Sequence, residues 1–441
     1  MDVTAEALES TLEQITPHTR PASTDDAVLG AQPRVVVEPE SEEQVADILR
    51  YANGAGLAVI PRGGGSQLGV GNPPRRADII LSMAHMNQLV EHAPHDLTVS
   101  AQAGMRLADL QRLLGVSGQW LALDPLLAPA ATLGGLISTN ASGARRLRYG
   151  GVRDQIIGVR VALADGTIAR GGGKVVKNVA GYDLPKLYTG ALGALGVILS
   201  ANFRLYPLPN FTATARLEAE DARALAAIVG RILAQPLTPA ALDIFSPTAP
   251  GAPYTLAARF ESGVQEAVET QTRLVSAAPI ADTADGAQPR DILSGEDEAR
   301  FWRDADALWR SPLTAPAANT ANIQTTIKAS LPLTAVADWL AALETACADG
   351  AMLARWRAHA GHGIVFAQVR ATPETLAQRI AALRRDASER RGSLVITELP
   401  SALVGAVDPW GPVAALKLMQ SLKQRFDPNG ILNPGRFVGG I

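Results

Sequence analysis

The stretch that most constrains this 441-residue chain is residues 61–71, which read PRGGGSQLGVG. A short apolar run at residues 57–60 precedes it and is typical of a buried strand that delivers a loop at a sheet edge. Three successive glycines tolerate positive φ, so several backbone N–H groups can converge on one anion, and Ser66 and Gln67 add side-chain donors. We therefore predict a diphosphate-binding loop, although a bare glycine triplet is more often a flexible surface loop.

Two further glycine-rich stretches favour the binding interpretation. Residues 131–143 (ATLGGLISTNASG) combine a glycine pair with small hydroxyl and amide side chains, which allow the backbone to approach a ligand closely. Residues 177–198 form a third glycine-punctuated segment that runs into an apolar strand. The first loop lacks G-x-G-x-x-G, and G-x-x-x-x-G-K-[ST] occurs nowhere, which argues against a Rossmann domain and a P-loop NTPase.

In this order and spacing, the three stretches resemble the FAD-binding domain of the vanillyl-alcohol oxidase (PCMH-type) flavoprotein family. Residues 426–436 (FDPNGILNPGR) resemble the closing motif of the branch that oxidises 2-hydroxy acids, while KNVAGYDLPKL and the DPWG of residues 408–411 are most similar to the smaller FAD-binding subunit of bacterial glycolate oxidase. The resemblance spans roughly residues 30–441. It implies an α+β protein with a two-part PCMH-type FAD-binding domain followed by an α+β cap domain.

The resemblance also implies which residues bind FAD. The family commonly links a histidine of the first loop covalently to the flavin, but Ser66 stands at that position here, so we expect noncovalent FAD that acid or heat releases. The candidate FAD-binding residues are Pro61, Arg62, Gly63, Gly64, Gly65, Ser66, Gln67, Leu68, Gly71, Pro125, Thr132, Leu133, Gly134, Gly135, Ser138, Thr139, Asn140, Ser142, Gly143, Gly196, Ile198 and Asn433. For Asn433 the alternative is an amide that caps the final turn.

The 2-hydroxy-acid dehydrogenases of this branch carry H-x-G-D-G-N-x-H and T-G-E-H-G motifs, which supply metal ligands and the active-site base. This chain matches them only in part. His359 is retained, but His362 replaces the aspartate and Phe366 the second histidine; Glu398 is retained, but Leu399 replaces the following histidine. We take His359 and Glu398 as catalytic candidates and predict no metal, leaving open that His359, His362 and Glu398 hold one.

Several other side chains have two interpretations. The arginines at residues 145, 146, 148 and 153 face either a carboxylate or the flavin, or form a surface patch with ordinary ion pairs. Lys174 is interpreted as a solvated loop lysine. The aromatic residues Phe301, Trp302, Trp309, Trp339 and Trp356 are interpreted as cap core or subunit interface.

The composition excludes several classes of protein. Forty basic and forty-three acidic side chains give a net charge of −3, which argues against nucleic-acid binding. The single cysteine, Cys347, excludes an internal disulfide and a cluster held by four cysteines, so any iron–sulfur cluster must sit on a partner. Because the chain shows neither a signal peptide nor an apolar run of about 18 residues, we expect a cytoplasmic protein that reaches a membrane only through a partner.

The length predicts two domains, and the prolines at 207 and 209 place their boundary: residues 1–209 form an N-terminal arm and the FAD-binding domain, and residues 210–441 form the cap with a C-terminal tail near the flavin. Ser41 and Gln44 form a capping box for a helix inside a β-α-β opening. We find no internal repeat. Further predictions are helices at 5–15, 105–114, 222–233, 333–348, 373–387 and 413–426, strands at 35–37, 78–83, 97–103 and 197–205, a hairpin at 164–167, and loops at 277–290 and 311–321.

Two functions remain open. The first is an FAD-dependent oxidoreductase of a small 2-hydroxy acid, glycolate or D-lactate, working as a glycolate oxidase subunit with a related flavoprotein subunit and an iron–sulfur subunit. The second is a non-catalytic subunit that carries flavin or relays electrons for the related catalytic subunit, which the incomplete histidine motifs favour. A weaker third is a nucleotide-binding scaffold with another substrate.

Overall fold

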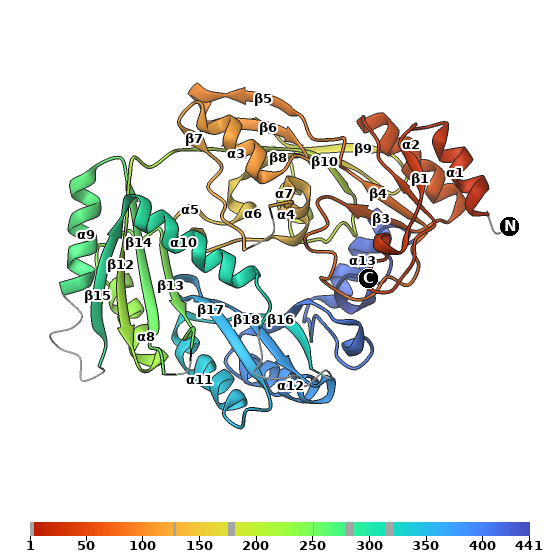
Figure 1. The fold of residues 1–441 in the computed structure, drawn as a ribbon. Coiled ribbons are helices and arrows are strands. Elements are labelled where there is room, and N and C mark those ends of the chain that lie inside the picture. The colour runs from red at the N-terminus through yellow and green to blue at the C-terminus, as the bar shows by residue number, and fades with distance from the viewer. Residues whose placement is uncertain (1–3, 127–128, 175–180, 250, 278–285, 314–321) are drawn as a thin grey trace.

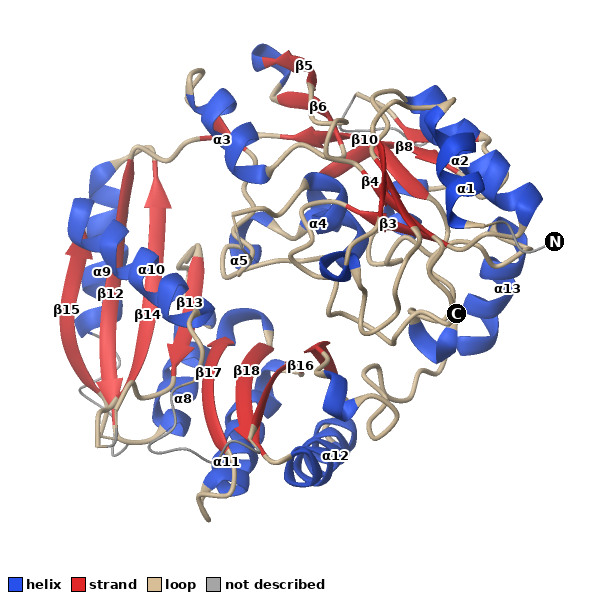
Figure 2. Cartoon of the chain, turned by 45° about the vertical axis from the view of Figure 1, so that its right-hand side comes forward, coloured by secondary structure: helices blue, strands red, loops and turns tan. Residues whose placement is uncertain are grey.

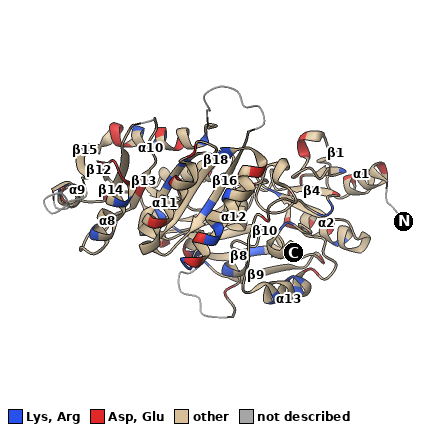
Figure 3. Ribbon diagram, turned by 90° about the horizontal axis from the view of Figure 1, so that it is seen from below, with Lys and Arg blue, Asp and Glu red and all other residues tan. Residues whose placement is uncertain are grey.

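The computed structural model describes residues 4–126, 129–174, 181–249, 251–277, 286–313 and 322–441. It contains two domains whose sheets lie on opposite sides of a central gap in the ribbon (Figure 1). Within the described ranges, every helix is too short or too polar to traverse a lipid bilayer. Acidic and basic residues are scattered over the ribbon of both domains (Figure 3), in keeping with the nearly balanced charge.

The first domain begins with the predicted β-α-β unit. Its sheet has the order β1-β2-β4-β3, in which β2, β4 and β3 are parallel and β1 is antiparallel to β2. Ser41 accepts a hydrogen bond from the Gln44 backbone, and the Gln44 side chain accepts one from the Glu40 backbone. The elements are α1 (Ala5–Glu13), β1 (Thr19–Pro21), β2 (Val35–Val37), α2 (Glu42–Ala55), β3 (Val59–Arg62) and β4 (Ile79–Ser82).

A second, antiparallel sheet with the order β5-β6-β10-β8-β9 completes the first domain. Gly166, with a φ of 81°, lies in the predicted hairpin between β8 and β9. The elements are β5 (Leu89–Ala93), β6 (Thr98–Gln102), α3 (Leu107–Gly115), β7 (Gln119–Trp120), α4 (Leu133–Thr139), α5 (Arg146–Tyr149), α6 (Val152–Gln155), β8 (Ile156–Ala162), β9 (Ile168–Gly172), α7 (Leu184–Tyr188), β10 (Val197–Arg204) and β11 (Tyr206–Pro207), which pairs with β7.

The second domain is one eight-stranded antiparallel sheet with the order β15-β12-β14-β13-β17-β18-β16-β19. Its elements are β12 (Phe211–Ala219), α8 (Ala222–Leu233), β13 (Ala241–Phe245), β14 (Tyr254–Ser262), α9 (Gln265–Ala277), β15 (Gln288–Ser294), α10 (Gly295–Arg310), β16 (Ile323–Ser330), α11 (Val336–Cys347), β17 (Leu353–His359), β18 (Ile364–Ala371), α12 (Pro373–Glu389) and β19 (Ser393–Glu398). Four helices, α8, α9, α11 and α12, cover the face away from the first domain, and α10 crosses the face toward it (Figures 1 and 2).

This sheet contains a structural repeat that the sequence analysis did not find. The order strand-helix-strand-strand-helix-strand occurs first from β12 to β15 and again from β16 to β19. Each half has the strand order of a ferredoxin-like unit, and the antiparallel pairing of β13 with β17 joins the halves. The expectation of no internal repeat is therefore wrong at the level of topology. The repeat is not visible in the sequence because two units can share strand order while different apolar residues fill their buried positions.

Two loop predictions need correction or lie outside the described residues. The predicted loop at 277–290 ends too late, because β15 already begins at Gln288 and pairs with β12. Residues 278–285, like 314–321 of the second predicted loop, lie outside the described residues.

The chain returns to the first domain at its C-terminus. Helix α13 (Leu416–Phe426) is followed by Asp427 as its C-cap. Beyond it, the Val59 backbone N–H donates to the Ile431 carbonyl (2.8 Å) and the Asn433 N–H donates to the Val59 carbonyl (2.9 Å). Ile431 and Leu432 are fully buried in the core of the first sheet. Residues 431–433 therefore lie alongside β3, the strand that carries the glycine loop, in a parallel bridge.

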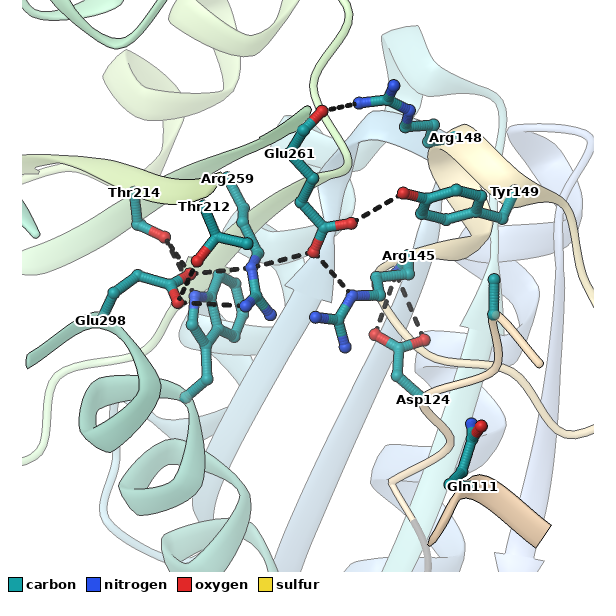
Figure 4. Close-up of polar contacts among 12 residues, drawn as sticks. Gln111, Asp124, Arg145, Arg148, Tyr149, Thr212, Thr214, Arg259, Glu261 and Glu298 are labelled. Atoms are coloured by element: carbon teal, nitrogen blue, oxygen red, sulfur yellow. Dashed lines mark hydrogen bonds and ion pairs between the residues drawn. The ribbon is translucent and has the colours of Figure 1, made fainter. Parts of the chain in front are cut away.

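A buried network of charges joins the two domains (Figure 4). Glu261 on β14 accepts hydrogen bonds from Arg145 Nε and Tyr149 Oη of the first domain, each at 2.9 Å, and forms an ion pair with Arg259 (3.1 Å). Arg259 also pairs with Glu298 of α10 at 2.7 Å. Burial opposes ionisation of Glu261, but the charges of Arg145 and Arg259 outweigh it and lower the pKa of this carboxyl.

We expect Glu261→Gln to destabilise the protein by about 3–5 kcal/mol, because it leaves the largely buried Arg145 without its carboxylate and removes one of the two carboxylates that pair with Arg259. The measurement is the free energy of unfolding in urea. The control is Glu296→Gln, which removes an exposed partner of Arg303 and should leave the unfolding curve unchanged. Equal stability of the two variants would contradict the importance of the network.

Candidate functional site

One cleft in the first domain is lined by the glycine loop, the first turns of α4, the start of β10 and the C-terminal segment. Most of the predicted cofactor-binding residues meet here, although they come from four separate stretches of sequence. The lining residues are Pro61, Arg62, Gly63, Gly64, Gly65, Ser66, Gln67, Leu68, Met83, Ala103, Thr132, Gly134, Gly135, Ser138, Thr139, Leu192, Gly193, Val197, Ile198, Asn433 and Arg436.

Glycine is required in the first loop because the backbone of another loop lies against it. A Cβ on Gly63 would stand 2.1 Å from Thr132 Oγ1, and one on Gly64 would stand 1.6 Å from the Ala130 carbonyl oxygen. In the described part of the chain, the backbone N–H groups of residues 64–67 find no acceptor. Several unpaired backbone N–H donors, on a loop that has no room for Cβ atoms, are suited to bind the diphosphate of FAD.

The C-terminal segment supports this loop through hydrogen bonds from Arg436. Arg436 is buried and donates from one guanidinium nitrogen to the carbonyl groups of Leu68 (2.7 Å) and Val70 (2.9 Å). Burial lowers the pKa of Arg436 to about 10. The sequence analysis included Arg436 in the closing motif but did not name it as a site residue.

Asn433 lines the same cleft and is also held by the chain. Its amide nitrogen donates to the Leu192 carbonyl at 2.6 Å, while its amide oxygen lies 3.5 Å from Arg436. The side chain thus fixes the turn after α7 to the C-terminal segment. We propose that it also contacts the flavin.

We expect truncation after Gly430 to lower FAD retention, because it removes the strand partner of Val59, the brace on Leu68 and the wall contributed by Asn433. Flavin content after gel filtration measures the effect. Truncation after Val438, which keeps all three features, is the matched control. Unchanged flavin affinity in the protein that ends at Gly430 would refute the placement of the C-terminal segment beside the flavin.

The cleft continues into a second cavity of about 600 Å³ between the two domains. Both are lined by residues 65–68, Ser138, Thr139 and Leu192. Predicted residues Pro125, Asn140 and Ser142 line the second cavity from the first domain. The second domain contributes Trp309, Arg310, Thr326, Lys328, Phe366, Gln368, Val395, Thr397 and Glu398. Among the described residues that line either space there is no histidine, cysteine or tyrosine, which agrees with the expectation of noncovalent FAD.

Lys328 is a candidate site residue that was not predicted from the sequence. It lies on β16 with its ammonium group 5.9 Å from the centre of the Phe366 ring, and no carboxylate within the described residues pairs with it. Burial, and secondarily the charge of Arg146, lower the pKa of Lys328 to about 8. A partly buried cation without a counter-ion in a cavity is suited to an anionic ligand. Its flanking sequence, IQTTIKAS, contains no motif that could have identified it.

The two catalytic candidates lie in different places. Glu398, at the end of β19, lines the second cavity and accepts a hydrogen bond from Thr326 Oγ1 at 3.1 Å. His359 is 1% exposed and lines neither space; its Nδ1 is 2.8 Å from Asp243, which also binds Arg357 at 2.7 Å. Burial opposes ionisation of Asp243, but the charges of His359 and Arg357 lower its pKa to about 2.

His362 lies beside His359, with ring centres 5.4 Å apart. Burial lowers the pKa of His362 to about 3, so the imidazole is neutral. In the part of the chain that the structure describes, His359, His362 and Glu398 do not converge as a group that could hold a metal ion.

Four predicted cofactor residues lie outside both spaces. Leu133 is fully buried in the core, and Gly71, with a φ of 90°, would place a Cβ 2.4 Å from the Arg436 carbonyl oxygen. A Cβ on Gly143 would meet the Asp124 carbonyl oxygen at 1.8 Å, and one on Gly196 would meet Val161 at 2.5 Å. These glycines permit close packing around the cleft.

The basic cluster is divided among different roles. Arg145 joins the interdomain network and stacks on Trp120, Arg148 donates to the Glu261 carbonyl, and Arg153 is exposed. Arg146 lies near Ser142 at the second cavity. Lys174 forms a surface pair with Glu91, as its interpretation as a solvated lysine requires. Trp302, Trp309, Trp339 and Trp356 are buried in the second domain.

Comparisons with known proteins agree with this geometry. An FAD binding domain matches residues 33–172, and a C-terminal domain of FAD linked oxidases matches residues 410–437. These matches confirm the predicted cofactor, FAD, and the predicted PCMH-type α+β architecture.

Similar proteins cover most or part of the chain. Glycolate oxidase subunit GlcD of Bacillus subtilis is 29% identical over 92% of this chain and 89% of its own length. A D-lactate dehydrogenase of Archaeoglobus fulgidus is 39% identical over 39% of each chain. The solved structure of an alkyldihydroxyacetonephosphate synthase matches with a TM-score of 0.69 at 17% identity, covering 92% of this chain and 76% of that one, which shows the fold alone.

Proposed function

Because the chain is an FAD-linked oxidoreductase, we propose that it oxidises a small 2-hydroxy acid of the glycolate or D-lactate class. In this proposal residues 1–209 hold the cofactor, and residues 210–441 cover it and return a tail to the flavin. The relatives named for glycolate, D-lactate and D-2-hydroxyglutarate all act on substrates with a carboxylate beside a hydroxyl group, and they support this class.

The observation that carries the proposal is the position of Lys328. A cavity that continues from the dinucleotide cleft contains one partly buried lysine without an acidic partner in the described residues, and this side chain can bind a substrate carboxylate. Trp309 and Phe366 line the same space and shield it from water.

Each group then has a separate task. When bound, FAD supplies the two-electron acceptor. Lys328 orients the carboxylate, and Glu398, whose carboxylate is oriented by Thr326, accepts the hydroxyl proton. His359 is a positioning residue in this scheme. Asp243 holds its ring against Phe366, which lines the cavity.

The test is anaerobic reduction of the purified chain's flavin by glycolate, D-lactate or D-2-hydroxyglutarate. Rapid loss of the visible absorbance of oxidised flavin with one of these acids, and not with L-lactate, is the expected result. Reduction by a hydroxy compound that lacks the carboxylate at the same rate would refute the substrate class.

A second candidate function is a flavin-carrying or electron-relay subunit of a glycolate oxidase complex. The buried position of His359, away from both cavities, supports it, because the family's motif places an active-site base on these strands. The partners would be a related catalytic flavoprotein subunit and an iron–sulfur subunit, with the complex in the cytoplasm or held at a membrane through a partner. Flavin reduction that begins only when those subunits are added would favour this function over the first.

A further inference from the structure

Two histidines and two glutamates gather at one edge of the first sheet, independently of the proposed substrate site. Glu38 and Glu40 follow β2, and His85 follows β4. Because β2 and β4 are parallel, their carboxyl ends reach the same edge. His18 directly precedes β1, which runs antiparallel to β2, and the Glu38 backbone N–H donates to the His18 carbonyl at 2.9 Å.

Three side chains of this cluster, those of His18, Glu40 and His85, are close enough to share an ion, and Glu38 adjoins His85. His18 Nε2 lies 3.0 Å from Glu40 Oε1, and His85 Nε2 lies 3.5 Å from Glu38 Oε2. The two imidazole rings stack with centres 4.4 Å apart. One ligand atom from each of His18, Glu40 and His85 lies within 4.8 Å of the others, and this is the one such group in the described ranges.

We propose that His18, Glu38, Glu40 and His85 bind Zn²⁺. Imidazole nitrogen and carboxylate oxygen are ligands that zinc takes in tetrahedral sites, with bond lengths of about 2.0–2.2 Å. Two carboxylates balance the charge of the ion when both imidazoles are neutral. Ser82 Oγ donates to Glu38 Oε1 at 2.9 Å, which leaves Oε2 directed at His85 and supplies the outer hydrogen bond that metal-binding carboxylates commonly have.

Bound zinc would connect the N-terminal arm to the sheet that carries the glycine loop. His18 ends the segment after α1, while His85 follows the end of β4, where Met83 lines the cofactor cleft. Without an ion, the same side chains form two largely exposed pairs, which contribute little to stability. Metal binding would therefore add a second attachment of the arm at this edge, beside the pairing of β1 with β2.

The test is calorimetric titration of the chelator-treated full-length holoprotein with ZnSO₄, followed by hydrogen exchange of residues 14–21. We expect one Zn²⁺ per chain and slower exchange of this segment in zinc. His85→Gln and, separately, Glu40→Gln should each weaken binding by at least about ten-fold, a loss that even outer partners of a metal can cause.

His95→Gln is the matched control, since His95 is an exposed histidine in a loop of the same domain, and it should bind zinc like the unaltered chain. Visible flavin absorbance confirms that each variant is folded. The proposal is overturned if His85→Gln and Glu40→Gln bind as tightly as the control, if binding is weak with several ions per chain, or if zinc leaves exchange in residues 14–21 unchanged.

Discussion

We expect Gly64→Val to give a folded protein that lacks FAD. A Cβ at this position would stand 1.6 Å from the Ala130 carbonyl oxygen, and neither backbone can retreat without moving the row of free N–H donors at residues 64–67. The added methyl groups would also occupy the space of the diphosphate. We expect flavin content to fall from about one per chain to less than about a tenth, because several backbone hydrogen bonds to a charged group are lost together.

The measurement is flavin absorbance per chain after gel filtration, with circular dichroism as the check on folding. Gly54→Val is the matched control, since a Cβ there meets nothing within 4 Å, and this variant should keep its flavin. Full flavin content in Gly64→Val would show that the diphosphate binds to another loop.

The parts of the fold that could be predicted from sequence are those set by local chemistry. The capping box at Ser41, the apolar face of α2 and the break after Phe426 each depend on residues within a few positions of one another. The glycine loops were also predictable, because a loop that must be free of Cβ atoms leaves a visible pattern. Even so, Gly143 and Gly196 show that the pattern does not distinguish close backbone packing from ligand contact.

The parts that could not be predicted depend on residues distant in sequence. Helix α10 is strongly charged and buries Glu298, Trp302 and Trp309 against the sheet, and its aromatic residues alone did not predict a helix there. In the sequence, Glu261 and Arg145 cannot be distinguished from charged surface residues. Their pairing and low exposure arise only where the two domains are in contact. Lys328 becomes distinctive only because β16, β18 and β19 place it in a cavity where no carboxylate of the described residues pairs with it. Buried charge, the best indicator of this site, is a property of tertiary structure.

Substitution of Lys328 should therefore have the second large effect. We expect Lys328→Met to lower kcat/KM for the 2-hydroxy acid by roughly ten- to a hundred-fold, mostly through KM, because a charged hydrogen bond to the carboxylate contributes about 1.5–3 kcal/mol. Flavin content should not change, since Lys328 lines the second cavity and not the dinucleotide cleft. Lys174→Met, which removes an exposed lysine from its pair with Glu91, is the control and should leave both values unchanged.

The pH dependence separates carboxylate binding by Lys328 from proton transfer by the same group. Burial lowers the pKa of Lys328 to about 8, so the side chain is a cation below this pH and loses its charge as the pH rises through it, while the substrate carboxylate stays anionic. If Lys328 binds the carboxylate, kcat/KM falls above about pH 8, and Lys328→Arg removes this fall because arginine keeps its proton. If kcat/KM instead rises through pH 8, the neutral amine is accepting the hydroxyl proton, and our assignment of that proton to Glu398 is wrong.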